Sequence, residues 1–554
     1  MNGKQKKSSS NFLIQGAILA SAGIISRLIG LAYRIPVNNI LGDEGQGFYG
    51  CAFSIYNIAL LLTSYSLPLA VSKLVSARVA KGEHKNAIRI FKGALFFALI
   101  IGALVGTLVF VCSEFIAGNI MSLKLSAYAL RVLAPGLFIV AVMGVLRGYF
   151  QGMGTMVPTA ISQILEQIVN AIVSIIGASY LLEMGKKAAA TQSNPSLPYA
   201  YGAAGGTLGT VTGAFVGMLF LLILIKMYYP RMKRRMLSDV TGNEESYKQI
   251  YAVLFLTIAP VLLSTAIYNI NDTIDQGIFS SAMVAQGHTE KEAAEFLGMF
   301  TGKYNTLIHI PLAVANALGA SLIPSLTASV SNGTKKEVRD KISMVIRFTM
   351  LIAIPSFIAF LAMPNQILSL LYVGNIDIPA KMLRLGAITV IFYCFSTVTN
   401  SILQGLNKMT TPVKHGLISL GIHLVAVFVM LVVLKWEIYG LVGGNIVFSL
   451  SMCVLNAKAL RKTAGYHQEL GKTFFQPLGA AAIMGLALLI TWNACALVLP
   501  EKVATLFSML LAVVVYVISL LKIGGLDADD ILALPKGETL LTLFYKCHLM
   551  KEEA

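Results

Sequence analysis

The stretch GALFFALIIGALVGTLVFV, residues 93–111, decides the fold class of this chain. It contains no charged side chain, and a helix of about 20 apolar residues crosses the hydrocarbon core of a bilayer. Similar stretches recur to the end of the chain, so the sequence predicts an all-α polytopic membrane protein. We expect about 14 transmembrane helices, near residues 12–35, 47–76, 89–112, 125–150, 156–182, 199–228, 249–280, 297–328, 342–363, 382–405, 412–434, 437–457, 475–498 and 503–521.

The composition agrees with a membrane protein. Of the 554 residues, 56% are hydrophobic and 12% are charged, and the mean hydropathy is +0.74. Soluble domains carry about 25% charged residues, so this composition excludes a soluble enzyme and a DNA-binding protein. The six cysteines lie far apart, without the spacing of a zinc site or a disulfide framework. The sequence therefore predicts no metal centre.

The net charge of +17 is unevenly distributed along the chain. With the N-terminus inside, the inner segments carry basic clusters within residues 78–89, 231–235 and 335–341, whereas outer segments carry single lysines such as Lys124 and Lys502. The positive-inside rule then places both termini in the cytoplasm. The basic start of the chain leads into a span longer than a signal-peptide core, so no cleavable signal is predicted.

The two halves of the chain repeat each other. Arg131 begins a span that ends in Gln151-Gly152, and Arg384 begins another that ends in Gln404-Gly405, at the same offset. A basic, glycine-containing turn at residues 81–85 recurs at 332–336. Each repeat holds six spans, so the two are parallel, as in transporters that bind substrate between two bundles and rock between them. A duplicated channel or scaffold without a transport cycle is the alternative.

The repeat defines the predicted domains. We expect an N-lobe of helices 1–6 (residues 1–230), a C-lobe of helices 7–12 (231–460), helices 13–14 (461–522) and a cytoplasmic tail (523–554). No loop is long enough for an extramembrane domain, and the sequence shows no nucleophile–base pair, phosphate loop or ATP-binding motif. We therefore predict that the protein is not an enzyme and has no cofactor. Its energy would come from an ion gradient, the membrane potential or another protein.

Charged residues inside the predicted spans are candidates for function, because a charge at mid-bilayer costs about 2.5–3.5 kcal/mol on insertion scales. The basic ones are Arg27, Arg34, Lys73, Arg131, Arg147, Lys303, Arg347 and Arg384, and the acidic ones are Glu166, Asp272 and Asp275. Of these, Arg131, Arg147, Arg347 and Arg384 are near enough to span ends to reach the interface. Glu166 is expected to pair with Arg147 or Arg131.

Arg27, Arg34 and Lys303 are the predicted substrate-binding residues. Arg27 and Arg34 are seven residues apart and share one face of the first helix, and Lys303 falls in the second span of the second repeat. A cavity containing these cations favours an anionic ligand, because arginine binds phosphate oxygens in a bidentate manner. Lys73 is a fourth candidate, closer to the cytoplasmic end of its span.

The seventh predicted span carries the candidate ion-coupling residues Asn271, Asp272 and Asp275. The two aspartates are i,i+3 neighbours on a helix. Carboxylates flanked by an amide oxygen suit a coupling Na⁺ or proton. Charge balance against Arg27, Arg34 or Lys303 is the alternative.

Two other features are predicted to be structural. His309, His415 and His423 lie in spans without a metal-like arrangement, so we expect them to form hydrogen bonds between helices. The segment from Ile523 to the end is interpreted as a short cytoplasmic appendage that includes an amphipathic surface helix.

Motifs in order along nearly the whole chain resemble one family, the SpoVB/MurJ-type flippases. These belong to the polysaccharide biosynthesis branch of the multidrug/oligosaccharidyl-lipid/polysaccharide (MOP) exporter superfamily. The resemblance rests on Ser26-Arg27-Leu28-Ile29-Gly30, Gly42 through Tyr49, Leu67 through Val75, Leu146 through Gly152, Pro158 through Gln167, Ala317-Leu318-Gly319, Ile323 through Leu326, Asp529-Asp530 and Leu534 through Gly537.

The resemblance implies a fourteen-helix exporter in a bacterial plasma membrane. It would move undecaprenyl-pyrophosphate-linked sugars, above all the peptidoglycan precursor lipid II, from the inner to the outer leaflet during cell-wall biogenesis. The pyrophosphate suits the cations predicted above, and the last two helices would hold the polyprenyl tail. The expected partners are this substrate, membrane lipids and cell-wall synthesis proteins, and not nucleic acid.

The sequence departs from the family in one motif. Proteobacterial members follow the first motif with an Arg-Asp pair, where this chain has Tyr33-Arg34. Detailed headgroup contacts therefore do not carry over, and the sporulation-type branch is the nearer match. Three alternatives stay open: a flippase for another lipid-linked glycan (capsule, teichoic or spore cortex), a cation-coupled multidrug exporter, and a scaffold for wall synthesis. A basic cavity disfavours the drug exporter, because organic cations favour an acidic one.

Overall fold

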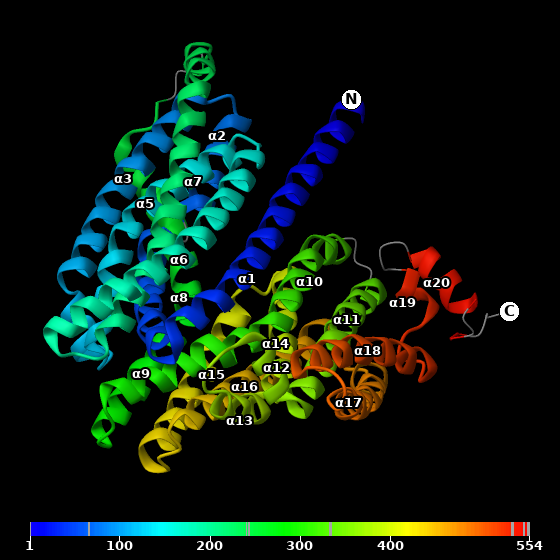
Figure 1. Cartoon of the computed structure of the whole chain (residues 1–554). Coiled ribbons are helices and arrows are strands. Elements are labelled where there is room, and N and C mark those ends of the chain that lie inside the picture. Colours follow the sequence, from blue (N-terminus) through cyan, green and yellow to red (C-terminus); the bar gives the residue numbers. More distant parts are fainter. Residues whose placement is uncertain are drawn as a thin grey trace. The chain divides into compact units, whose positions relative to one another are not determined.

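The computed structural model describes residues 2–554 except 65–66, 240, 242–243, 332–334, 533–536, 547–548 and 551–554, and it describes no side chains for 2–14, 16–17, 20, 259–269, 324–325, 328 and 529. Within the part described, every regular element is a helix (Figure 1). The chain forms two compact units, residues 1–302 and 303–554.

The first unit contains eleven complete helical segments, many of them far longer than a bilayer requires. They are α1 (Asn2–Thr63), α2 (Leu67–Ala80), α3 (His84–Val111), α4 (Ser113–Phe115), η1 (Ile116–Ile120), η2 (Lys124–Ser126), α5 (Ala127–Gly152), α6 (Val157–Gln192), α7 (Leu197–Leu237), α8 (Tyr247–Ala285) and α9 (Glu290–Gly298). The π-helical turn η3 (Met299–Tyr304) carries the boundary between the two units.

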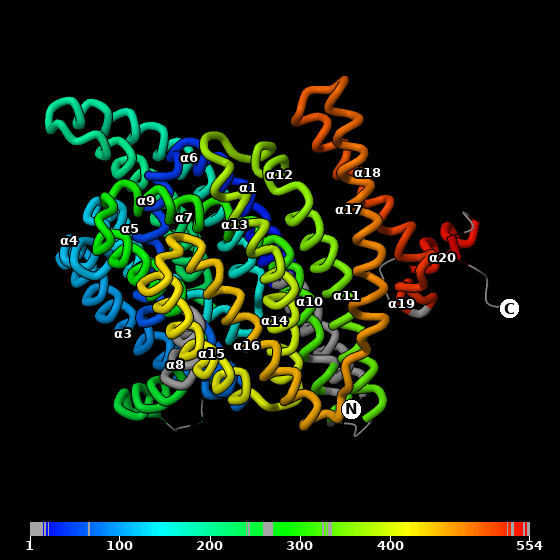
Figure 2. Tube along the Cα trace, turned by 90° about the horizontal axis from the view of Figure 1, so that it is seen from below, coloured from blue at the N-terminus to red at the C-terminus, as the bar shows by residue number. Residues whose placement is uncertain are grey.

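The second unit follows from that turn. Its helices are α10 (Asn305–Ser331), α11 (Lys335–Ala362), α12 (Pro364–Leu371), α13 (Asp377–Gly386), α14 (Ile388–Gly405), α15 (Thr410–Phe428), η4 (Val429–Val433), α16 (Ile438–Ala464), η5 (Gly471–Phe475), α17 (Gln476–Cys495), α18 (Glu501–Lys522), α19 (Ala528–Leu532) and α20 (Gly537–Lys546). The last two apolar helices, α17 and α18, form an antiparallel hairpin whose α17 also packs on α11 (Figure 2).

Helix α1 consists of two helices joined at Gly42. This residue has φ 65° and ψ −178°, a backbone conformation that a side chain strongly disfavours. The kink separates the helix that carries Arg27 and Arg34 from the helix that runs to Thr63. The chain breaks again before α2, which begins at Leu67.

Small residues bring α6 and α7 into backbone contact. A Cβ on Gly205 of α7 would lie 2.0 Å from the carbonyl oxygen of Gly177 on α6, and one on Gly209 would lie 2.1 Å from Ser174 Oγ. Ser174 Oγ also donates to the carbonyl of Gly206 across this contact, at 2.8 Å. Close packing of this kind drives helix association in a membrane, where lipid is as apolar as the side chains.

The all-α membrane fold is confirmed, and the exact number of spans stays a prediction. Eleven described helices are long and apolar enough to cross a bilayer, and the pair α13 and α14, bent by 51°, makes twelve. That count takes residues 21–80 as one span, although the Gly42 kink and the break before α2 divide it. It also leaves out α8, whose apolar part with described side chains covers only residues 247–258. The number of spans counted in the structure differs from the fourteen predicted at these two places.

The predicted repeat falls on corresponding helices. Gly152 ends α5, and its counterpart Gly405 ends α14. The first-repeat helix is continuous, whereas the second is bent between Gly386 and Ile388. The second copy of the basic turn, at 332–334, lies outside the described residues. The predicted lobe boundaries at 230 and 460 stay predictions.

Candidate functional site

Arg27 and Arg34 lie on the part of α1 before the Gly42 kink, and both side chains are exposed. Another face of this helix is fixed to α6, where Asn170 Nδ2 donates to Tyr33 OH at 3.1 Å. Neither arginine forms an ion pair or a hydrogen bond with another described residue. Both guanidinium groups are therefore available to an anionic ligand.

Lys73 lies on α2, and its side chain is also exposed. It has no ion-pair partner in the described parts of the chain. Arg78, one and a half turns further along, is by contrast paired with Glu245 at 2.8 Å. Lys73 thus joins Arg27 and Arg34 as an exposed cation of the first unit that no described carboxylate neutralises.

Lys303 is in a different environment. Its residue is 1% exposed, and Nζ donates to the backbone carbonyl of Asn375 at 2.7 Å. Both residues belong to the second unit, with Lys303 in the π-helical turn η3 and Asn375 in the loop between α12 and α13. Single-turn π segments are frequent at functional sites. Lys303 is therefore buried, with its ammonium group against the Asn375 carbonyl, and its predicted role in binding stays a prediction.

The candidate ion-coupling residues divide between a buried and an exposed side of α8. Asn271 and Asp275 are 4% and 2% exposed, and Asn271 Nδ2 donates to Asp275 Oδ2 at 3.5 Å. Asp272 is exposed. Thr273 Oγ1 donates to the carbonyl of Ser54 at 3.0 Å and attaches α8 to α1.

Asn271 also carries an unsatisfied acceptor. Its Oδ1 is buried and has no hydrogen-bond partner among the described residues. A buried oxygen without a donor is costly, and a bound cation beside Asp275 would satisfy it. Asn271 and Asp275, one turn apart, therefore form the buried part of the candidate cation site.

Glu166 has a structural partner, as predicted. Its Oε2 lies 2.7 Å from Arg147 Nη2, and Arg147 Nε donates to Ser162 Oγ at 2.9 Å. Arg131 pairs instead with Glu114 at 2.7 Å. Two of the basic residues assigned to structural roles therefore have carboxylate partners within the first unit.

Two of the three histidines join helices, as predicted. His415 Nδ1 of α15 lies 2.7 Å from Asn456 Oδ1 of α16, and His423 Nδ1 lies 2.8 Å from the carbonyl of Gly444. Both contacts join α15 to α16. Within the described residues, no group of three His, Cys, Asp or Glu side chains could hold a metal ion.

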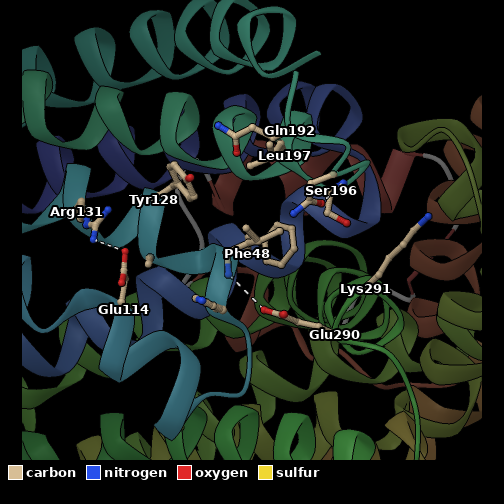
Figure 3. Close-up of a pocket in the computed structure, with 13 residues that line it drawn as sticks. Phe48, Glu114, Tyr128, Arg131, Gln192, Ser196, Leu197, Glu290 and Lys291 are labelled. Carbon is tan, nitrogen blue, oxygen red and sulfur yellow. Dashed lines mark hydrogen bonds and ion pairs between the residues drawn. The ribbon is translucent and has the colours of Figure 1, made fainter. Parts of the chain in front are cut away.

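A polar pocket of about 440 Å³ also lies in the first unit (Figure 3). Its walls come from α1, α4, η2, α5, the connection from α6 to α7, and α9, and its charged lining residues are Glu114, Lys124, Arg131, Glu290 and Lys291. Sequence reasoning used Lys124 only for topology and did not find this pocket. No sequence signal could have found it, because the pocket exists only where the ends of six segments come together.

The family comparison matches the first part of the chain. The model for "Polysaccharide biosynthesis protein" matches residues 13–330, more than half of the chain. The lipid II flippase MurJ of Bacillus subtilis (strain 168) is 26% identical over 501 residues, covering 87% of this chain and 89% of the relative. Stage V sporulation protein B of the same organism is 24% identical over 420 residues, covering 76% and 77%.

Solved structures of the same fold agree with the helical architecture. The lipid II flippase MurJ in an inward closed conformation has a TM-score of 0.64 at 12% identity, covering 91% of this chain and 98% of that structure. An inward-facing MATE-family multidrug transporter of the MOP superfamily has a TM-score of 0.59 at 16% identity, covering 79% and 96%. The fold is thus similar to that of these multi-pass membrane proteins.

Proposed function

The chain belongs to the polysaccharide biosynthesis protein family, and on that premise we propose that it is a flippase for lipid-linked glycans. The proposed substrate is the undecaprenyl-pyrophosphate-linked peptidoglycan precursor lipid II, which would move from the inner to the outer leaflet by alternating access. The relatives MurJ and stage V sporulation protein B support this class of function. The relative MurJ is named as a flippase and the MATE structure as a transporter, and neither as an enzyme.

The exposed, unneutralised cations of the first unit carry the proposal. Arg27, Arg34 and Lys73 present three positive charges from helices α1 and α2, and none has a described carboxylate partner. A cation in a spanning helix is expensive unless it lines a polar cavity or reaches the interface. A pyrophosphate would supply the missing counter-charge during transport. Lys303 stays a predicted binding residue of the second unit, where its Nζ donates to the Asn375 carbonyl.

The test is complementation of a bacterium depleted of its lipid II flippase, together with a lipid II translocation assay. We expect the unmodified protein to restore growth, and Arg27→Gln and Arg34→Gln to lower translocation at least tenfold at equal membrane abundance. The matched control is Arg384→Gln, since Arg384 is also exposed and also lacks a described ion-pair partner. Normal translocation by the Arg27→Gln, Arg34→Gln double variant would reject the site.

We further propose that a cation gradient drives the cycle through Asp275 and Asn271, with Asp272 at the exposed edge of the site. The buried Asp275 carboxylate and the unsatisfied Asn271 Oδ1 support this assignment. Oxygen ligands of this kind suit Na⁺, and a carboxylate alone suffices for a proton. The alternative is that these carboxylates balance the charge of basic residues and take no part in ion coupling.

The coupling ion is tested in proteoliposomes. A Na⁺ gradient and a pH gradient are imposed in separate experiments. Only one of the two gradients should stimulate translocation by the unmodified protein. Asp275→Asn should remove that stimulation, and Asp272→Asn should reduce it less because its side chain is exposed. Stimulation that persists in Asp275→Asn would rule the site out.

The proposed location is the bacterial plasma membrane, with both termini in the cytoplasm. In the first unit the basic residues at the start of α3 lie beside the segment that follows the basic end of α7: Lys85 N–H donates to Asp239, and Arg89 pairs with Glu244. Positive charge gathered at one end of the helices is the pattern of a cytoplasmic face. A fluorescent protein fused after residue 554 should fluoresce, and alkaline phosphatase fused there should be inactive. The opposite result would reverse the orientation.

A second candidate substrate is another lipid-linked glycan, for which the relative with a sporulation name gives the specific support. All undecaprenyl-pyrophosphate carriers present the same anionic group to Arg27 and Arg34, so these residues do not discriminate between them. Translocation assays with lipid II and with a capsule or teichoic precursor, run side by side, separate the two substrates.

A further inference from the structure

Leu197, at the start of α7, lines the pocket of Figure 3, whereas the basic residues 231–235 lie near the other end of α7. The residues of the pocket come from the first turns of α5, α7 and α9, whereas the basic residues lie at the first turns of α3 and the last turns of α7. Under the proposed orientation the pocket opens outside the cell. A flipped headgroup would arrive on this side.

The charges of the pocket are mixed. Arg131 is paired with Glu114 on one wall, and Glu290 Oε1 accepts from the backbone N–H of Leu125 at 3.3 Å on another (Figure 3). Lys124 is exposed and has no ion-pair partner in the described part of the chain. Three cations and two carboxylates line the pocket, so its net charge of +1 attracts a polyanion such as pyrophosphate only weakly. The pocket instead suits an amphoteric ligand that carries both acidic and donor groups.

The opposite wall carries the other cation, Lys291. It pairs only loosely with Glu295, at 3.8 Å, and its side chain is 52% exposed. Lys291 therefore gives this wall an exposed cation.

Neutral groups complete the lining. The Tyr128 ring is supported by Tyr201, with centroids 5.2 Å apart. Asn194 Oδ1 accepts from the N–H of Ser196 at 3.0 Å, which leaves its amide nitrogen as a donor. Gln192 adds a second exposed amide (Figure 3). An aromatic face with amide donors is chemistry that suits a sugar ring and peptide bonds, and about 440 Å³ is within the range of ligand pockets.

We propose that this pocket is a second binding site for the sugar–peptide part of the lipid-linked precursor, distinct from the pyrophosphate site on α1 and α2. The proposal rests on the proposed flippase function. Lys124 and Lys291 bind peptide or sugar carboxylates, Tyr128 stacks on the sugar, and Asn194 donates to a carbonyl. Binding on the outer side holds the headgroup after it crosses and lowers its probability of return.

The probe is N-acetylmuramyl pentapeptide, a soluble sugar–peptide without pyrophosphate or lipid. Its binding to the full-length protein in lipid nanodiscs is measured by isothermal titration calorimetry. The Lys124→Gln, Lys291→Gln double variant should weaken binding at least tenfold, and Tyr128→Leu at least fivefold. Thermal unfolding of each variant checks that it folds. The charge variants keep the proposal testable if Tyr128→Leu does not fold, because both lysines are exposed.

Two controls separate this site from its surroundings. Lys186→Gln, at the same end of α6 but outside the pocket and paired with Glu183, should bind as the unmodified protein does. Arg27→Gln should also bind the probe normally, and pyrophosphate should not compete with it. Competition by pyrophosphate, or unchanged affinity in the double lysine variant, overturns the proposal.

The two proposals fail differently. If the unmodified protein translocates lipid II but does not bind the soluble probe, only the second site is rejected. If it binds the probe through Lys124 and Lys291 but translocates no lipid-linked substrate, the binding site stands and the flippase function is rejected.

Discussion

Arg347 Nη1 and Asp530 Oδ2 lie 2.6 Å apart, although 183 residues separate them in the chain. Arg347 lies on α11 and Asp530 on the tail helix α19, and their side chains are 13% and 9% exposed. Glu469 approaches the same guanidinium at 3.2 Å, and Lys472 pairs with Asp527 at 2.7 Å. A largely buried ion pair, with three more exposed charges around it, thus attaches the tail to the rest of the second unit. The sequence predicted a surface appendage and an arginine that reaches the interface, and it did not predict this ion pair.

Asp530→Asn should destabilise the protein. Removing one partner leaves Arg347 largely buried, with Glu469 at 3.2 Å and Asp527 at 3.9 Å as its remaining carboxylates. We therefore expect a loss of about 1–3 kcal/mol, below the roughly 3–5 kcal/mol of a fully uncompensated buried charge. Thermal unfolding in detergent measures the effect, and limited proteolysis detects release of the tail. Asp527→Asn, at a side chain 46% exposed, is the control and should cost less. Equal losses would contradict the assignment of Asp530 as the main anchor.

Glu166→Gln should lower stability without lowering translocation per folded molecule, because Glu166 pairs with Arg147 rather than with substrate. Contacting charged pairs give coupling energies of about 0.5–3 kcal/mol in double-mutant cycles. We expect a value in that range from thermal unfolding of Glu166→Gln, Arg147→Gln and the double variant. A strong translocation defect in a stably folded Glu166→Gln variant would reassign the residue to the transport site.

Gly205→Ala should weaken the α6–α7 contact, because the new methyl group would lie 2.0 Å from the Gly177 carbonyl oxygen. Overpacking of this kind costs about 1–3 kcal/mol. Gly421→Ala in α15 is the matched control, since a Cβ there meets nothing within 4 Å. Alanine in place of an exposed helical glycine stabilises by roughly 0.5–1 kcal/mol, so the two variants should shift the unfolding temperature in opposite directions.

Asp239 should give the first unit a pH-dependent contribution to stability. Hydrogen bonds from the Thr241 hydroxyl and the Lys85 and Thr241 backbone N–H groups lower the pKa of its carboxyl from 3.8 to about 2. Because the folded-state pKa is depressed, the contribution is complete above about pH 4 to 5 and disappears as the pH falls through about 2. The unfolding-temperature difference between the unmodified protein and Asp239→Asn should therefore be constant near neutral pH and vanish towards pH 2. A difference that does not change with pH would contradict this account.

The membrane fold could be predicted because hydrophobicity is a local property of the sequence. Residues 93–111 lie within α3, and the repeated Gln-Gly pairs end α5 and α14. Helix lengths could be predicted less accurately, because α6 and α7 extend past their apolar stretches, to Gln192 and Leu237. Backbone hydrogen bonding continues a helix beyond the lipid when neighbouring helices support it, and hydropathy does not report that support.

The sequence could predict which residues belong to the candidate site, but not whether each side chain is exposed or which group it contacts. The excess of cations over acids in the spans, together with the positions of the cations within them, singled out Arg27, Arg34, Lys73 and Lys303. Exposure depends on the tertiary structure. The sequence therefore could not predict that Arg27, Arg34 and Lys73 are exposed, or that Lys303 is buried against the Asn375 carbonyl. For the same reason it could not separate buried Asp275 from exposed Asp272.

The sequence by itself determined that this protein spans a membrane many times, and it predicted a duplication and an excess of cations in the spans. These properties follow from side-chain transfer energies and from spacing along one chain. Only the tertiary structure decided which charges neutralise one another, as in Arg147 with Glu166 and Arg347 with Asp530, and where a polar pocket forms. Ion pairs and pockets depend on distances between distant segments, and packing of the helices sets those distances.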